Sequence, residues 1–239
     1  MQALIDADLV AFRCAASAEG DDTEIALIRA DKLMQEIISD VGAESHRSFL
    51  TGTNNFRKQL TTDYKANRKG KELPRHLTAC REFLVAHWGT EVVHGYEADD
   101  ALGMYQSGDT IICSLDKDLK QVPGNHYNWV KKEFTTVTHD EGLLSFYTSL
   151  LVGDRADNII GAVGIGPVKA GKLLGTALPE EYYEICRQVY NDDERLHLNC
   201  KLLWIWRKEN DIFTPPVSNE TEVQQEPSQR SGDSLSDDM

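Results

Sequence analysis

Little in the sequence points to an oxidising compartment or a membrane. The five cysteines are scattered, and none belongs to a Cys-x-x-Cys pair, so neither a disulfide framework nor a zinc site is predicted. No apolar run approaches the ~20 residues of a membrane span. The N-terminus has no basic region followed by an apolar region, as a signal peptide would. We therefore expect a globular, cytoplasmic protein with no membrane partner.

Positive charge is also scarce, because the 239 residues carry a net charge of −14. By itself this value argues against a nucleic-acid partner. The charges are unevenly distributed, however. Residues 214–239 contain six acids and one base, whereas residues 57–75 contain seven bases and two acids. A strongly basic segment thus lies within an acidic chain, and composition does not exclude nucleic acid.

Apolar patterning predicts strands that alternate with helices in the first two thirds of the chain and helices alone in the last third. The predicted strands are 3–6, 48–50, 91–93, 109–115 and 127–130, and the predicted helices are 24–39, 76–88, 98–105, 140–152, 167–174, 180–190 and 192–208. The alternation is typical of an α/β domain with a mostly parallel sheet. From Thr214 onward, Pro, Ser, Gln, Asn and acids predominate, which predicts a disordered tail.

Three acidic motifs directly follow predicted strands: Asp6-Ala7-Asp8, Glu97-Ala98-Asp99-Asp100 and Asp116-Lys117-Asp118. Ligands of parallel α/β sheets bind beyond the carboxyl ends of the strands, so the motifs are expected to converge. Converging carboxylates repel one another, and Mg²⁺ or Mn²⁺ would supply the counter-charge. Two such ions are typical of phosphodiester hydrolysis. Any one motif alone is better explained as a turn or a helix start.

A fourth acidic motif leads into a glycine-rich stretch. Asp154 and Asp157 are three residues apart and would share one side of a helical turn. Pro167 then predicts a helix start whose free amides would bind a phosphate, with Lys169 and Lys172 one turn inside. This pattern predicts a helix–hairpin–helix phosphate clamp. Without a ligand, the same stretch is a glycine-rich turn between two helices.

The basic segment contains bases at helical spacing beside an aromatic residue. Lys65 and Arg68 would share a helical face, and Tyr64 could stack on a base or sugar. Such bases would contact phosphates and orient the scissile one. The alternative is a solvated basic face with no ligand.

Together these motifs resemble the 5′-nuclease superfamily, which comprises flap endonucleases and the 5′→3′ exonuclease domains of bacterial DNA polymerases. The resemblance is strongest to the compact 5′→3′ exonucleases of bacteriophages and extends from about Ala3 to Gly175. The residues that carry it are Leu4-Ile5-Asp6, Tyr64-Lys65-Ala66-Asn67-Arg68, Glu97-Ala98-Asp99-Asp100, Ser114-Leu115-Asp116-Lys117-Asp118, and Gly153-Asp154 with Asp157-Asn158 leading into Gly164-Ile165-Gly166.

The resemblance implies an α/β, PIN-like fold with three parts: a catalytic domain at 1–138 with a helical arch at about 56–75, a helical DNA-binding region at 139–213 with a helix–hairpin–helix, and the acidic tail at 214–239. The implied ligands of two Mg²⁺ ions, which Mn²⁺ could replace, are Asp6, Glu97, Asp99, Asp100 and Asp116 for the first and Asp116, Asp118, Asp154 and Asp157 for the second. The implied catalytic residues are Lys65, Arg68 and Asp116. The implied DNA-binding residues are Tyr64, Lys65, Arg68, Lys69, Gly164, Gly166 and Lys169, with a potassium ion near Val163–Gly166.

The implied activity is that of a metal-dependent 5′→3′ exonuclease or flap endonuclease acting on DNA or primer RNA in phage replication and recombination. Expected partners are duplex DNA with a 5′ end or 5′ flap, an RNA–DNA hybrid and phage replication proteins. We expect a monomer in the host cytoplasm. One feature departs from the pattern: many relatives carry an acid shortly before the Phe-Arg pair, whereas Thr51–Arg57 contains none.

Two other functions remain open from the sequence. A PIN-type ribonuclease would share the acids, but a hairpin that clamps a duplex backbone suits DNA or hybrids better. A non-catalytic DNA-binding protein would use only the basic segment and the hairpin. The retained acids disfavour that second reading, because unneeded carboxylates near DNA weaken binding.

Overall fold

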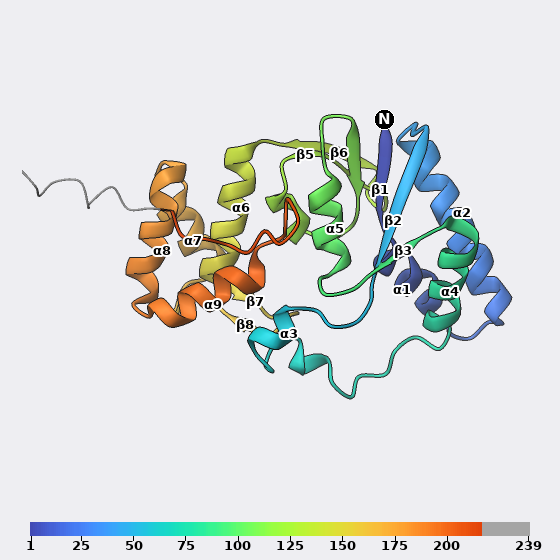
Figure 1. Cartoon of the computed structure of the whole chain (residues 1–239), viewed down its shortest axis with the longest axis horizontal. Helices are drawn as coiled ribbons and strands as arrows, with labels where there is room; N and C mark the ends of the chain where they lie inside the picture. The colour runs from blue at the N-terminus through green and yellow to red at the C-terminus, as the bar shows by residue number, and fades with distance from the viewer. Residues whose placement is uncertain (217–239) are drawn as a thin grey trace, which may run out of the picture.

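A central six-stranded sheet organises the first part of the chain (Figure 1). The computed structural model describes residues 1–216. The strands are β1 (Gln2–Asp6), β2 (Ser45–Thr51), β3 (Glu91–Val93), β4 (Thr110–Cys113), β5 (Gly124–Asn128) and β6 (Glu133–Val137), in the spatial order β3-β2-β1-β4-β5-β6. All neighbours are parallel except β5 and β6, which pair antiparallel. The predicted α/β fold with a mostly parallel sheet is confirmed.

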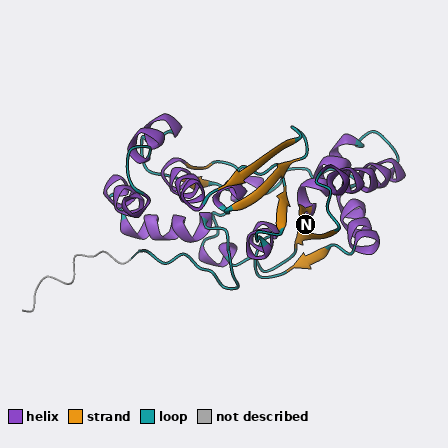
Figure 2. Ribbon diagram, turned by 90° about the horizontal axis from the view of Figure 1, so that it is seen from above, coloured by secondary structure: helices purple, strands orange, loops and turns teal. Residues whose placement is uncertain are grey.

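Helices cover both faces of this sheet, as the view in Figure 2 shows. The helices α1 (Ala7–Ser17), α2 (Thr23–Asp40) and α4 (Leu77–Trp88) pack on one face and α5 (Ala98–Tyr105) on the other. Strand β1 lies between them, with Ala3, Leu4 and Ile5 fully buried. A strand that is buried on both faces needs a continuous apolar run, and this explains the opening of the sequence.

The last third of the described chain forms a helical region beside the sheet. It consists of α6 (His139–Val152), a two-stranded hairpin of β7 (Gly153–Asp154) and β8 (Ile159–Ile160), α7 (Pro167–Leu174), α8 (Tyr182–Tyr190) and α9 (Asp193–Leu203), with the 3-10 turn η3 (Pro179–Glu181). It has its own hydrophobic cluster, which also takes in Tyr64 from the basic segment. Conversely, Ile205 packs into the cluster between the sheet and α5. No helix among residues 1–216 is long and apolar enough to cross a bilayer.

The predicted helical arch at 56–75 is wrong in its secondary structure. This segment contains only a single turn of helix, α3 (Arg57–Leu60), and the 3-10 turn η1 (Ala66–Arg68). Lys65 has a left-handed backbone with φ +57, which no helix accommodates. Its amide donates instead to Asp157 O at 2.9 Å. Contacts with the β7–β8 hairpin therefore replace internal helical hydrogen bonds.

Other predicted elements also differ from the structure. Helix α1 was not predicted, although Asp6 caps it by accepting from the Leu9 amide at 3.2 Å. The last predicted helix, 192–208, ends at Leu203. Beyond it, the backbone of Ile205 and Trp206 bonds to side chains of other elements rather than continuing the helix. The predicted disordered tail lies, from residue 217 on, outside the described residues.

Candidate active site

The acidic motifs meet at the carboxyl ends of the central strands. Asp6 ends β1, Asp116 follows β4, Asp99 lies in the first turn of α5, and Asp154 lies in β7. They surround a cavity of about 270 Å³. The acids that line it are Asp6, Asp8, Glu97, Asp99, Asp116, Asp118, Asp154 and Asp157. Seven of the eight acids predicted as metal ligands are thus brought together by segments far apart in the sequence.

One group of acids forms no direct ion pair with a base in the described part of the chain. Within residues 1–216, Asp6, Asp99 and Asp116 form no ion pair with a lysine or arginine. Burial, with the charges of Asp8 and Asp116, raises the pKa of Asp6 to about 7. Burial together with Asp6 and Asp116 raises the pKa of Asp99 well above its ordinary value. These side chains are oxygen donors held close together with unmet negative charge, which is what a hard divalent cation requires.

Hydrogen bonds from neighbouring groups fix the positions of these acids. Ser114 Oγ donates to Asp6 Oδ2 at 2.7 Å and accepts from the Asp116 amide at 3.0 Å. The Asp118 amide in turn donates to Asp116 Oδ1 at 2.8 Å. Asp118 begins the 3-10 turn η2 (Asp118–Gln121). Ser114 therefore links the ends of β1 and β4 and sets the spacing between two predicted ligands.

A second group lies around Asp118 and Asp154. Burial, with the nearby Asp116 and Asp154, raises the pKa of Asp118 to about 7. Burial also acts to raise the pKa of Asp154, but hydrogen bonds from Asp118 and the Ala156 amide outweigh it, so the pKa is lowered. Two carboxyl groups held this close repel each other when both are ionised, so the pair favours a proton or a cation between them.

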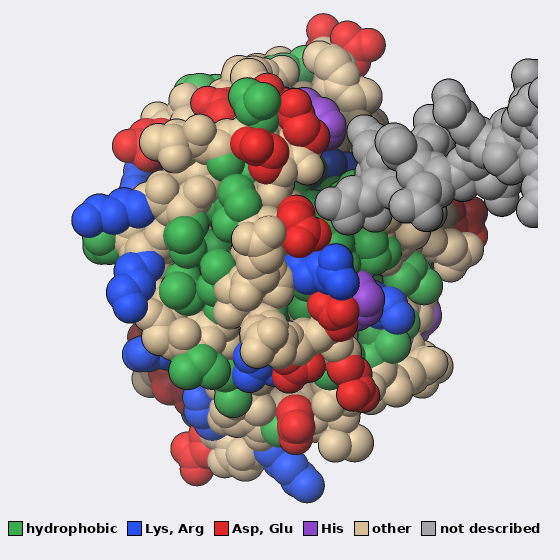
Figure 3. All heavy atoms as spheres, turned by 90° about the vertical axis from the view of Figure 1, so that its left-hand side faces the viewer, with side chains coloured by type: hydrophobic (Ala, Val, Ile, Leu, Met, Phe, Trp, Pro, Cys, Tyr) green, Lys and Arg blue, Asp and Glu red, His purple; other side chains and the backbone are tan. Residues whose placement is uncertain are grey.

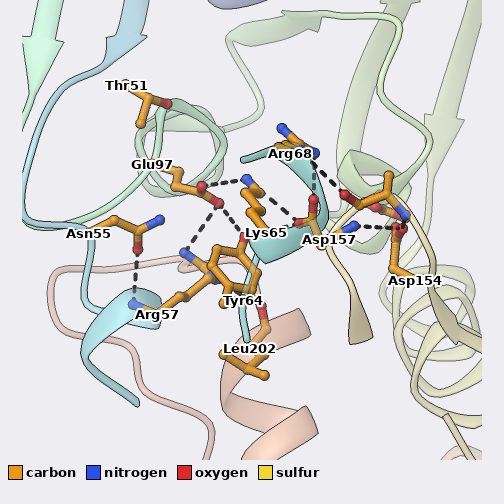
Figure 4. A network of polar contacts seen from close by, with 12 residues as sticks. Thr51, Asn55, Arg57, Tyr64, Lys65, Arg68, Glu97, Asp154, Asp157 and Leu202 are labelled. Atoms are coloured by element: carbon orange, nitrogen blue, oxygen red, sulfur yellow. Dashed lines mark hydrogen bonds and ion pairs between the residues drawn. The ribbon is translucent and has the colours of Figure 1, made fainter. Parts of the chain in front are cut away.

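Bases of the basic segment pair with the remaining acids (Figure 4). Lys65 Nζ lies 2.5 Å from Glu97 Oε1 and 3.6 Å from Asp157 Oδ2, and Arg68 donates to Asp157 Oδ1 at 2.6 Å. Burial acts to raise the pKa of Glu97, but Lys65 and Arg57 outweigh it and lower the pKa. The structure thus brings the two predicted catalytic bases to the acidic cavity.

Asp100 is the one predicted metal ligand that does not line the cavity. It is fully buried and accepts from Arg57 through both oxygens, at 2.6 and 2.9 Å. It also accepts from the amides of Glu97 and Trp206. All of its lone pairs face protein donors, so the prediction of Asp100 as a metal ligand is corrected: it anchors Arg57 and the start of α5.

The prediction that Tyr64 stacks on DNA is likewise corrected, because the side chain is only 4% exposed. Its hydroxyl lies 2.8 Å from Glu97 Oε2 and 3.0 Å from Asp157 Oδ2. Tyr64 therefore joins an acid of α5 to an acid of the β7–β8 hairpin. Lys69, by contrast, is exposed at the rim of the site, as a DNA contact requires.

The glycine-rich turn links the β7–β8 hairpin to α7. Gly164 has φ +74, and its carbonyl accepts from Lys169 Nζ at 2.9 Å. Gly166 caps α7, which Pro167 opens. Figure 3 shows that acidic, basic and hydrophobic side chains intermix on the side of the molecule where α6, α7 and α8 lie in Figure 1. The helix–hairpin–helix, its DNA contacts and its potassium ion stay predictions.

Sequence reasoning missed three residues that shape the site. Arg57 is 2% exposed, and Arg81 pairs with Asp8, whose Oδ2 also accepts from the Thr51 amide at 2.8 Å. Ser114 was quoted only as part of a motif. For Arg57 and Arg81 the sequence offers no signal, because nothing local distinguishes a buried arginine from the solvated bases around it.

The donor set fits a hard divalent cation, although the side chains would have to rotate to bind one. In the part of the chain that the structure describes, no three acidic, histidine or cysteine side chains are placed to hold one ion as they stand. Several of the acids bond to Lys65, Arg68 or each other instead. Ion binding therefore requires these contacts to be exchanged for contacts with the cation.

Comparison with known proteins identifies the family. Residues 2–147 match the family model for the 5′-3′ exonuclease N-terminal resolvase-like domain. The chain belongs to this family. It is 30% identical over 138 residues to a flap endonuclease Xni of Shewanella baltica, covering 51% of this chain and 53% of the relative. It is 33% identical over 151 residues to a 5′-3′ exonuclease of Mycoplasma pneumoniae, covering 53% and 52%. The chain thus spans about half the length of the curated relatives it matches.

Solved structures show the same fold. One is the flap endonuclease of bacteriophage T5 in a pseudo-enzyme-product complex with DNA and metal ions. It superposes with a TM-score of 0.64 at 14% identity, over 83% of this chain and 86% of that one. The predicted 5′-nuclease family and its fold are therefore confirmed.

Proposed function

We propose that the protein is a metal-dependent nuclease that hydrolyses phosphodiester bonds of DNA from a 5′ end or at a 5′ flap. The observation that carries this proposal is the single cavity lined by eight carboxylates, with Lys65 and Arg68 at its edge. The names of the family members support the reaction and its direction, and the T5 structure supports DNA and metal ions as its ligands.

The acids divide into two sets that would each hold one divalent ion. Asp6, Glu97, Asp99 and Asp116 would hold the first, and Asp116, Asp118, Asp154 and Asp157 the second. We propose Mg²⁺ as the natural ion, with Mn²⁺ as a substitute. When bound, two such ions lower the pKa of a water and stabilise charge on the leaving oxygen.

The basic residues would act once the carboxylates no longer hold them. Lys65 and Arg68 currently pair with Glu97 and Asp157. Freed from these acids, they would bind the non-bridging oxygens of the scissile phosphate and stabilise its growing negative charge. Ser114 would hold Asp6 and Asp116 in place throughout, because its hydroxyl bonds to both.

The helical region would hold the duplex beside the cut. Exposed apolar side chains at Ile160, Val163 and Val168 surround the glycine-rich turn, and the first amides of α7 are free to bind a phosphate. We propose this turn as the duplex contact, with Lys169 and a potassium ion at Val163–Gly166. RNA–DNA hybrids, a phage origin, replication partners, a monomeric state and a cytoplasmic location belong to the same proposal.

The test is cleavage of a 5′-labelled duplex and a 5′ flap in magnesium, with the products sized on a gel. Short 5′ products that vanish in chelator are expected. Asp116→Ala should lower turnover by about a thousandfold or more while DNA binding is retained. Cleavage confined to single-stranded RNA would favour the ribonuclease. DNA binding that is indifferent to magnesium, without cleavage, would favour the non-catalytic binding protein.

A further inference from the structure

A second cavity of about 690 Å³ adjoins the acidic one. One wall is formed by Thr51 at the end of β2 and the loop 52–55 that follows, and another wall is formed by basic side chains of residues 58–69. Lys65 and Arg68 line both cavities, so the two are separated by the thickness of these side chains. A group bound in the second cavity would therefore lie next to the group that is cut.

The two acids of the second cavity are already neutralised. Asp8 pairs with Arg81 from α4. Glu97 pairs with Lys65 and lies 3.8 Å from Arg57. Neither carboxylate therefore leaves negative charge that would keep an anion out.

Three donors of this cavity lack a partner among residues 1–216. Lys58 and Lys69 are exposed and have no carboxylate within ion-pair distance. Asn55 is 4% exposed, and its Nδ2 is buried without a hydrogen-bond acceptor. Its Oδ1 accepts from the Arg57 amide at 2.9 Å, which fixes which side of the amide points inward. Figure 4 shows the nitrogen turned away from Arg57, to the side on which Glu97 lies. A buried amide donor without a partner is costly and indicates a missing acceptor.

The loop that presents Asn55 is held firmly, and its position 52 has no room for a side chain. Its backbone bonds to the segment after β3, with Gly52 N to Val93 O at 2.7 Å and Gly95 N to Thr53 O at 2.9 Å. A Cβ at Gly52 would lie 2.5 Å from Val93 O and 2.7 Å from the His94 ring. Packing therefore keeps a carboxylate out of position 52, and the four bases that line the cavity outnumber its two acids.

We propose that this cavity is a phosphate site that binds the phosphate next to the one being cut, with Asn55 Nδ2 as the buried donor and Lys58 and Lys69 as the charges. The role next to the cut rests on the proposed nuclease function. Phosphate matches the donors present, since its oxygens accept from an amide and several ammonium groups at once. The phosphate could be a terminal 5′-phosphate or an internal diester.

The first experiment measures anion binding without any cleavage. Inorganic phosphate is added to the ¹⁵N-labelled full chain in chelator, and the side-chain amide resonances of Asn55 are followed. A saturable shift is expected with phosphate and not with chloride at equal ionic strength. Lys58→Met should weaken this binding about tenfold, whereas Lys32→Met, the same change at an exposed lysine of α2, should leave it unchanged. An Asn55 signal that ignores phosphate, or equal effects of the two lysine changes, would overturn the site whether or not the protein is a nuclease.

The second experiment finds the source of the phosphate. Cleavage is compared for duplexes with a 5′-phosphate or a 5′-hydroxyl, and for duplexes with one neutral methylphosphonate on either side of the cut. For the wild type, one of these changes should lower kcat/KM by about tenfold. A loss with the 5′-hydroxyl identifies a terminal phosphate, and a loss with a methylphosphonate identifies an internal one.

Asn55→Asp keeps the acceptor for Arg57 but replaces the inward donor with a carboxylate oxygen. In this variant and in Lys58→Met, removing or neutralising the same phosphate should lower kcat/KM by only about twofold. Variants that keep the full wild-type sensitivity would contradict the placement of the site beside the cut.

Discussion

Arg57 shows how one buried side chain can organise an acidic site. Its guanidinium donates to both oxygens of Asp100 and to the carbonyls of Leu202 and Trp204. Burial acts against its charge, but Asp100 and the nearby Glu97 outweigh this and raise its pKa. The arginine therefore ties the start of α5, which carries Glu97 and Asp99, to the chain that leaves α9.

Removing this arginine should be severely destabilising. Arg57→Met leaves the Asp100 carboxylate buried without a counter-charge, which costs about 3–5 kcal/mol. Arg57→Lys should recover only part of that loss, because an ammonium cannot make the two parallel bonds. Urea denaturation measures both. In a double-mutant cycle with Asp100→Asn, additive losses would show that the two side chains do not act as a pair.

Crowded carboxylates should make the ion-free protein less stable than it could be. Burial and the nearby Asp6 raise the pKa of Asp99, and Asp99→Asn removes its charge. In chelator the free energy of unfolding of this variant should therefore exceed that of wild type by about 1 kcal/mol. A raised acid pKa destabilises the fold as pH rises above the ordinary value, so the gain should be larger at pH 8 than at pH 5. The same variant should lose cleavage. The control is Asp109→Asn, at an exposed acid outside the cavity, which should change neither the stability nor the cleavage. Equal gains in stability at both positions would count against repulsion in the cavity.

His126 gives an acid limit that is independent of the site. Burial lowers its pKa to about 4, and its Nε2–H donates to Val122 O at 2.7 Å. The unfolded chain, with a histidine pKa of about 6.5, takes up the proton first. The stability that neutral His126 provides is therefore complete above pH 6.5 and is lost as pH falls toward 4. Urea denaturation gives the free energy of unfolding of wild type and of His126→Gln at each pH. Between pH 7 and pH 5 the wild-type value should fall by about 2 kcal/mol relative to the variant. A constant difference across this range would show that the ring stays protonated or exposed.

At the scale of elements, the sequence predicts what is locally encoded. Strands β1 and β4 are apolar runs, and the acids after them fall at strand ends whatever the exact register, so Asp6 and Asp116 were placed correctly. The segment 56–75 was not, because its conformation depends on bonds to residues 155–157 that no local pattern reveals. Asp100 was misassigned for the same reason. Its neighbour Asp99 faces the cavity, and only the packing of Arg57 distinguishes the two.

The loop after β2 should tolerate no side chain at its first residue, Gly52. Gly52→Ala would force a Cβ against Val93 O and the His94 ring, and relieving such a clash costs about 1–3 kcal/mol. Gly20→Ala, where nothing lies within 4 Å of the added carbon, should cost much less. Thermal unfolding compares the two, and similar losses would show that the loop shifts freely. Because this loop carries Asn55, a displaced loop should also weaken phosphate binding.

At the scale of the whole molecule, the site is a seam between the sheet and the helical region. Asp6, Asp99 and Asp116 come from the sheet side, and Asp154 and Asp157 come from the hairpin after α6. Tyr64 and the Arg57–Leu202 contact also cross this seam. The two regions have separate main hydrophobic clusters, and these polar contacts add to the apolar packing of Tyr64 and Ile205 in joining them.

Divalent ions that bind at this seam should stabilise both regions together. An ion that binds only the folded chain adds about 2.7 kcal/mol at a hundred times its Kd, so Tm should rise with magnesium concentration while the transition stays single. Asp118→Asn removes an acid that faces the helical region and should lose part of this rise, whereas Asp109→Asn should keep it. Limited proteolysis should show the hairpin 153–160 protected on magnesium addition, because the ion would tie Asp154 and Asp157 to the acids of the sheet side. The segment 61–69 should gain no protection, because Lys65 and Arg68 would be released from Glu97 and Asp157. An unchanged rate of cutting in the hairpin would mean that the ion is held by the sheet side alone, and the seam would then be only a boundary.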